Sequence, residues 1–207
     1  NQIDLNNSTD LLINTNIDKE FIYGRGWTYG SEWMVEKKRG TLTGWVSYTL
    51  GWSWQQFSEI NDGVKYPSRY DRRHDVTLAL AYKISKRLSF SCTWVFGTGN
   101  AITLPVSRFA VQDVIGSPYK VVPQYLPRNS FRMPNFHRMD MGLVWKFLNK
   151  KFDSELVFSV YNVYNRKNTY FIYFAPEKNE DGDIIKFVAS KVSLFPFIPS
   201  ISYNYKF

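Results

Sequence analysis

A strict alternation of apolar and polar residues is the feature that most constrains how this chain can fold. Between residues 87 and 98 every second side chain is apolar and most of the others are small and polar; the apolar ones are Leu88, Phe90, Cys92, Trp94 and Phe96. A period of two places successive side chains on opposite faces of a β-strand. Such a strand needs an apolar environment on one side and a polar environment on the other.

The alternation recurs along the chain and predicts seven long antiparallel strands. They are expected at residues 26–37, 41–55, 72–84, 87–98, 135–148, 152–165 and 200–207. The connections alternate between short basic turns (36–40, 84–87 and 147–151) and long loops (55–71, 99–133 and 165–195). Short turns at one end and long loops at the other are typical of bacterial outer-membrane β-barrels, whose strands cross the bilayer at a tilt.

Composition excludes several classes of protein. The sequence has no apolar run long enough for a transmembrane helix. Its mean hydropathy of −0.33 is compatible with a membrane barrel, because half of each strand faces a polar lumen. Lys and Arg outnumber Asp and Glu by 8 but are scattered, which argues against nucleic-acid binding. The single cysteine, Cys92, excludes an internal disulfide, and no metal-ligand spacing occurs, so neither a metal nor another cofactor is expected.

The apolar faces could contact lipid or form the core of a soluble lipocalin-like barrel, and alternation alone leaves both open. Aromatic residues are 18% of the chain and cluster at strand ends, which favours lipid because aromatic girdles mark the membrane interfaces. We therefore expect these side chains to face lipid: Leu78, Leu80, Phe90, Trp94, Met141, Leu143 and Phe158. The charged side chains expected to face the lumen are Glu32, Lys83, Asp140, Lys146 and Glu155.

Strand direction predicts that this sequence is part of a larger barrel. We expect the last strand to end in the periplasm. Because successive antiparallel strands alternate in direction, counting back through seven strands places the start of the first strand outside the cell. Complete single-chain barrels have an even strand number. We therefore expect residues 1–23 to be an extracellular loop segment and residues 24–207 to be C-terminal strands of a transmembrane antiparallel β-barrel.

Several segments, in the expected order, carry a family resemblance. They are YGSEWMVEKKRGTLTGWVSYTLGWSWQQF, YPSRYDRRHDVTLALAYKISKRLSFSCTWVFGTGNAITLP, VFSVYNVYNRKNTYFIYF and the closing SYNYKF. Together they resemble the C-terminal barrel of TonB-dependent outer-membrane receptors of the Bacteroidetes type. The stretch SVYNVYNR is similar to an Asn-Leu-Phe-type segment on the penultimate strand of that family.

The resemblance implies a barrel of about 22 strands, closed by an N-terminal plug and energised by TonB for nutrient uptake. It implies contacts between lumen-facing side chains and the plug, which this sequence lacks, and contacts of the outer wall with lipid and lipopolysaccharide. TonB would act through the parent protein, and one subfamily, whose chains end differently, adds a surface lipoprotein. Tyr203, Tyr205 and Phe207 resemble the terminal signal read by the barrel-assembly machinery.

Candidate ligand contacts lie near the expected outer mouth. Arg72 and Arg73 in YDRRHD, and Tyr119 and Tyr125 in the loop at 99–133, are expected to contact either ligand or the barrel rim. Paired surface charges are mostly structural, which favours a rim role for the two arginines. No catalytic arrangement stands out, so we do not expect an enzyme. The alternatives are a small outer-membrane enzyme or adhesin, and a non-transporting barrel scaffold in an outer-membrane complex.

Overall fold

The structure, a computed structural model, describes residues 2–3, 21–111, 120–148, 153–178 and 184–206. The chain forms two compact units. We call Asn1–Gly30, Gly51–Arg72 and Asn100–Met133 the loop unit, and Ser31–Leu50, Arg73–Gly99 and Pro134–Phe207 the sheet unit. The described residues form antiparallel β-strands and one 3-10 turn, with no α-helix, so the all-β antiparallel prediction is confirmed.

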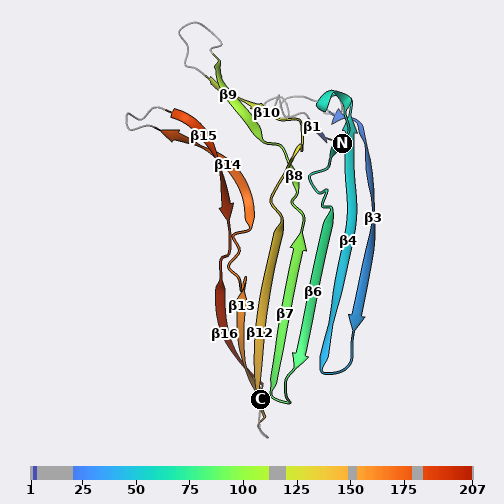
Figure 1. Cartoon of the computed structure of the whole chain (residues 1–207), viewed down its shortest axis with the longest axis vertical. Helices are drawn as coiled ribbons and strands as arrows, with labels where there is room; N and C mark the ends of the chain where they lie inside the picture. Colours follow the sequence, from blue (N-terminus) through green and yellow to red (C-terminus); the bar gives the residue numbers. More distant parts are fainter. Residues whose placement is uncertain (1, 4–20, 112–119, 149–152, 179–183, 207) are drawn as a thin grey trace. The chain divides into compact units, whose positions relative to one another are not determined.

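Seven long strands form one sheet and follow one another in chain order (Figure 1). They are β3 (Gly24–Lys37), β4 (Leu42–Phe57), β6 (His74–Lys83), β7 (Leu88–Gly97), β12 (Phe136–Leu148), β13 (Asp153–Tyr161) and β16 (Ile198–Lys206). The path is open, with β3 and β16 as its two edges, so these strands do not close into a barrel. Each of the seven lies where the alternation predicts a strand.

The connections between these strands hold further structure. In the sheet unit, β14 (Thr169–Lys178) pairs with β15 (Ile184–Ser193) as a hairpin within the expected loop 165–195. In the loop unit, the short strands form local pairs: β1 (Gln2–Ile3) with β2 (Phe21–Ile22), β8 (Ala101–Ile102) with β11 (Phe131–Arg132), and β9 (Pro105–Val111) with β10 (Lys120–Tyr125). The 3-10 turn η4 (Asn61–Gly63) precedes β5 (Tyr66–Pro67), which pairs with the end of β4.

Strand register aligns the alternating residues across the sheet. One row runs Leu80–Cys92–Met141–Val160–Pro199 from β6 to β16. The next row runs Ala81–Ser91–Gly142–Ser159–Ser200, and its side chains point to the opposite face. One face is therefore apolar and bulky, and the other is lined by small and polar side chains.

The two units differ in what they bury. Among the described residues, the buried hydrophobic side chains are Phe57, Tyr66 and Ala101, all in the loop unit. In the part of the sheet unit that the structure describes, no hydrophobic side chain is buried. Its buried residues are the glycines Gly97 and Gly99 and the polar Ser154 and Asn162. The apolar face of the sheet is thus not a protein core.

Candidate functional site

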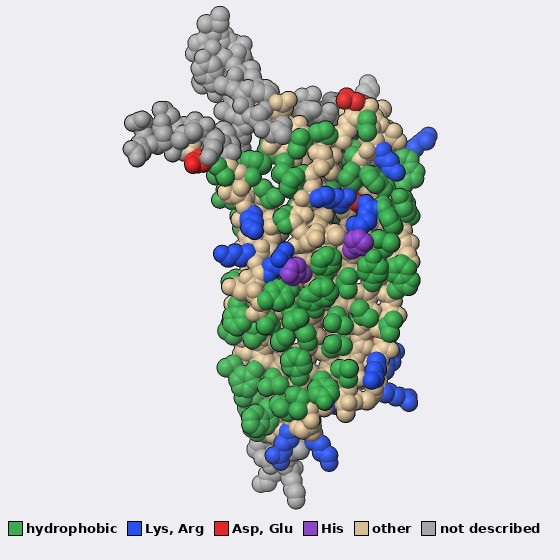
Figure 2. Space-filling view, in the orientation of Figure 1, with side chains coloured by type: hydrophobic (Ala, Val, Ile, Leu, Met, Phe, Trp, Pro, Cys, Tyr) green, Lys and Arg blue, Asp and Glu red, His purple; other side chains and the backbone are tan. Residues whose placement is uncertain are grey.

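The apolar sheet face is the largest candidate for a functional surface. Register places all seven side chains predicted to face lipid on this one face, and none of them is buried. Exposure reaches 38% at Phe158 and 69% at Ile201 of the edge strand β16. Figure 2 shows hydrophobic side chains gathered over these strands. Monomeric soluble proteins rarely leave so continuous an apolar patch in water.

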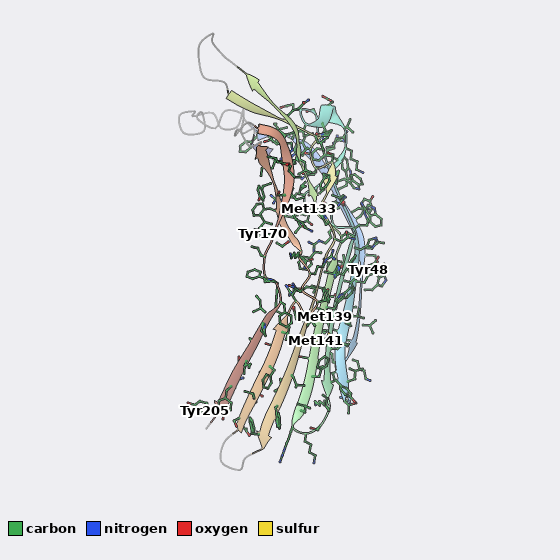
Figure 3. The ribbon with its side chains drawn as sticks, turned by 60° about the vertical axis from the view of Figure 1, so that its left-hand side comes forward. Tyr48, Met133, Met139, Met141, Tyr170 and Tyr205 are labelled. Atoms are coloured by element: carbon green, nitrogen blue, oxygen red, sulfur yellow. The ribbon has the colours of Figure 1, made fainter. Side chains whose placement is uncertain are left out.

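Aromatic side chains with polar tips lie toward the ends of this face. Trp33 of β3 stacks on Tyr48 of β4 at 5.4 Å between ring centroids. Tyr48 Oη lies 2.8 Å from Nδ1 of His74, which begins β6 at the end of that strand away from the turn to β7. Toward the turns, Tyr203 stacks on Tyr205 at 6.2 Å. The row Leu80–Cys92–Met141–Val160–Pro199 between these ends has no charged or hydroxyl-bearing side chain. Figure 3 labels Tyr48 of β4, Met141 of β12 and Tyr205 of β16 on these strands. Phe207 lies outside the described residues.

The opposite face carries the charged side chains that were predicted to line a lumen. Register places Lys83, Asp140, Lys146 and Glu155 on it, and Lys146 lies directly opposite Glu155 in the β12–β13 ladder. Asn204 Nδ2 donates to Glu155 Oε1 at 3.2 Å. Glu32 belongs to this face as well, because its neighbour Trp33 stacks on the apolar side. A wall of paired charges and small polar groups suits a hydrated surface.

The stretch SVYNVYNR forms a polar anchor at the end of β13. Asn162 is 1% exposed; its Nδ2 donates to the carbonyl oxygens of Arg166 and Phe195, and its Oδ1 accepts from the Arg166 N–H at 3.0 Å. Asp140 Oδ1 accepts from the Asn162 backbone N–H at 2.9 Å and also binds Arg138. These bonds tie the end of β13 to the segment that enters β16. Sequence reasoning did not single out Asn162.

The described short turns carry a dense basic charge. Lys37 ends β3, Lys38 and Arg39 follow it in the turn to β4, and Lys86 and Arg87 lie between β6 and β7; all five are exposed. The ion pair between Lys38 Nζ and Glu36 Oε2 at 3.1 Å is exposed to solvent and contributes little to stability. These side chains lie next to the turn end of the apolar face, where Figure 2 shows a cluster of Lys and Arg.

The loop unit contains a second candidate, a pair of adjoining cavities. The larger has a volume of about 1060 Å³ and the smaller about 620 Å³. Asn61, Tyr125, Leu126 and Arg128 line both cavities. Tyr125, predicted as a ligand or rim contact, therefore lies at this site. Tyr119 lies outside the described residues, and neither Arg72 nor Arg73 lines these two cavities.

Asparagine side chains fix the walls of the cavities. Asn61 Oδ1 accepts from the Arg128 backbone N–H at 2.7 Å, and Asn61 Nδ2 donates to the Arg128 carbonyl at 3.3 Å. Asn129 Nδ2 donates to the Pro67 carbonyl at 2.9 Å, while the Asn129 N–H donates to Thr103 Oγ1. Both asparagines have positive φ, a conformation that Asn tolerates better than most residues. Segments more than 60 residues apart are thus held in one arrangement.

An ion pair with one buried partner lies in the same unit. The Asp71 side chain is fully buried; it accepts from the Ser53 backbone N–H and forms an ion pair with Arg132, which also donates to the Asp71 carbonyl. Sequence reasoning placed Asp71 in a charged string near the rim but did not predict its burial or its partner. The two residues are 61 positions apart, and no local pattern connects them.

Comparison with protein-family models, with curated proteins and with solved structures finds no match to this chain. Within the described residues, no helix has the length and hydropathy to cross a membrane. The described residues also contain no group of three or more His, Cys, Asp and Glu side chains that could hold a metal ion. The resemblance to TonB-dependent receptors therefore remains an interpretation of the sequence.

Proposed function

We propose that this chain forms part of the wall of a transmembrane β-barrel in a bacterial outer membrane, the C-terminal part of a barrel of about 22 strands. We propose further that the whole barrel is a TonB-dependent nutrient importer. One observation carries the membrane proposal: seven long strands present a continuous apolar face on which no described hydrophobic side chain is buried. Lipid acyl chains are the environment that such a face requires.

Energetics favour lipid over water for this face. Burying apolar surface is worth about 25 cal/mol per Å², so a face of many Leu, Met, Phe and Trp side chains is costly to leave in water. The ladder hydrogen bonds of the five inner strands meet the demand that backbone groups in lipid be paired. Each of the seven strands has at least 9 residues, which matches the about 9 to 11 that a tilted strand needs to cross a bilayer.

The open edges support a larger barrel. Within the described chain, β3 and β16 each pair on one side only, and both expose aromatic side chains such as Trp33 and Tyr203. Unpaired strand edges cannot face lipid, and a closed barrel removes them. Further strands of the same polypeptide are the simplest partners for both edges.

The importer proposal rests on the resemblance and on the polar face. The polar anchor around Asn162 lies within SVYNVYNR, the segment that resembles the family's penultimate strand. The charged face with Lys146, Glu155 and Asp140 offers a hydrated wall that a plug domain can contact. Assembly of the barrel would use the assembly machinery, and the outer contacts would be lipid and lipopolysaccharide.

A cell experiment tests both parts of the proposal. The coding sequence is tagged in the organism that carries it, and membranes are separated by density and washed with alkaline carbonate. We expect carbonate-resistant material in the outer-membrane fraction. Deletion should impair growth on at least one limiting nutrient in a panel, and deletion of TonB should abolish the difference between the two strains. Recovery in the soluble fraction would refute the membrane part, and a growth defect independent of TonB would refute the importer part.

A further inference from the structure

We propose that the paired cavities of the loop unit form a binding site for small organic acids, that is, compounds with one carboxylate on an apolar body. This inference rests on the proposed function and deepens it, because it names the class of solute that the loop unit would bind. The two cavities have the volume of ligand pockets, which usually measure about 300 to 1000 Å³.

Two arginines provide the chemistry for a carboxylate. Arg69 and Arg128 both line the larger cavity, and neither guanidinium has an ion-pair partner among the described residues. A guanidinium presents parallel N–H donors that match a carboxylate bidentately. Glu59 is the single acidic side chain on this wall, so the wall carries a net positive charge and disfavours cationic solutes.

The rest of the wall suits an apolar body. Ile60, Ile102 and Leu126 line the larger cavity together with Tyr70 and Tyr125, whose side chains are 82% and 59% exposed. Exposed aromatic rings beside aliphatic side chains offer large contact areas at low entropic cost. The apolar part of a ligand can therefore lie against these residues while its carboxylate meets the arginines.

The site is also preorganised. The hydrogen bonds of Asn61 and Asn129 hold the Arg128 backbone in place against the turn at Asn61 and against Pro67. In the smaller cavity, Lys65 is held over the rings of Trp27 and Trp54, with its Nζ 5.2 and 4.7 Å from their centroids. A wall that is already ordered loses little entropy when a ligand binds.

A matched pair of probes tests this inference. The full chain in detergent micelles is titrated with 2-naphthoate and with 2-naphthamide, which share one ring system and differ in charge. We expect saturable binding with at least a tenfold preference for the acid. Micelles and the apolar sheet face favour the amide, so they cannot produce this preference. Equal binding of the two probes to the unaltered chain would overturn the inference without any variant.

Two double variants test whether the cavity arginines cause the preference for the acid over the amide. In the double variant Arg69→Gln/Arg128→Gln the preference should fall to about twofold or less. The control Arg39→Gln/Arg87→Gln removes the same charge from two exposed turn arginines and should keep the preference. An equal loss in the control would assign the effect to overall charge and overturn the inference. The titration does not depend on lipid insertion, so its failure leaves the proposed function standing, and failure of membrane fractionation leaves a positive titration intact.

Discussion

The sheet unit and the loop unit differ in where their hydrophobic side chains lie. In the loop unit, Phe57, Tyr66 and Ala101 are buried, and polar side chains such as Asp71 and Asn129 are buried with them and hydrogen-bonded. In the described sheet unit, hydrophobic side chains stand on one face and none is buried. The loop unit therefore contains its own small core, whereas the sheet unit needs an apolar phase that it does not itself supply.

This difference teaches where the stability of each unit comes from. The sheet is held by its ladder of backbone hydrogen bonds and by whatever covers its apolar face. The loop unit is held by a few specific side-chain contacts between distant segments. Substitutions in the loop unit should thus act in any solvent, and substitutions on the sheet face should act according to the surrounding phase.

The largest effect is expected at the ion pair between Arg132 and the buried Asp71 in the loop unit. Arg132 is 40% exposed but its partner Asp71 is fully buried, so Arg132→Met leaves the buried carboxylate without this charge, which costs up to about 3 to 5 kcal/mol. Protease resistance of the loop unit should fall accordingly, and adding Asp71→Asn should restore part of it. The exposed Arg69→Met is the control and should change little. Equal resistance of the two arginine variants would contradict the assigned role of Arg132.

The next effect separates the two faces of the sheet. Leu80→Arg places a charge on the apolar face and should cost about 2 to 4 kcal/mol in a bilayer, with reduced insertion into vesicles. The neighbouring Ala81→Arg places the same charge on the opposite, polar face, where Ala81 is exposed, and should insert normally. Equal insertion of both variants would remove the distinction between the faces.

A third effect tests the ladder itself. Gly44 has a φ of 150° and pairs with Leu80, and a Cβ there would collide with the carbonyl oxygen of Ala79. Gly44→Ala should therefore destabilise the sheet unit by about 1 to 3 kcal/mol in urea titrations. Gly51→Ala is the matched control, because its Cβ would lie at an ordinary contact distance of 3.5 Å from the Arg72 carbonyl oxygen. A control variant as unstable as Gly44→Ala would refute this steric reason.

The smallest expected effect is an increase in the stability of the loop unit. Tyr66 is buried, and its hydroxyl has no hydrogen-bond partner among the described residues, so Tyr66→Phe should stabilise the loop unit by about 1 kcal/mol. Burial raises the Tyr66 pKa above its ordinary 10.0, against the opposing charge of Arg128. Because the folded state resists ionisation of Tyr66, its pKa shift leaves the stability of the loop unit unchanged below pH 10 and lowers that stability as pH rises through the folded-state pKa. Tyr66→Phe should lose less stability above pH 10; an unchanged alkaline slope would contradict the assignment.

The sequence predicts the sheet well because its information is local. Alternation between residues 87 and 98 predicts β7 within one residue at each end. The largest difference is at 152–165, because β13 ends at Tyr161, where Asn162 takes a positive φ of 55° and the chain leaves the sheet. A period of two indicates a strand and also shows which side chains share a face of that strand. The residues of each face were therefore predictable as well.

The loop unit was not predictable in the same way. Its cavities and its ion pair join segments such as 55–71 and 100–133, and no periodicity connects Asp71 with Arg132 or Asn61 with Arg128. The short strands β8 to β11 lie in a Pro-rich stretch without sustained alternation. Tyr125 was predicted as a contact because aromatic side chains in loops often bind ligands, but the arginines that line its cavity were not.

The most direct measurement uses Cys92, the single cysteine of the chain, which lies on the apolar face between Leu80 and Met141. A small fluorophore on Cys92 is compared with one on Ser91→Cys in a Cys92→Ser background, in lipid vesicles with nitroxides on the acyl chains or iodide in the water. We predict that acyl-chain nitroxides quench the label at position 92 and that iodide quenches the label at position 91. Quenching of the Cys92 label by iodide, with none by lipid nitroxides, would contradict the proposal that this face contacts lipid.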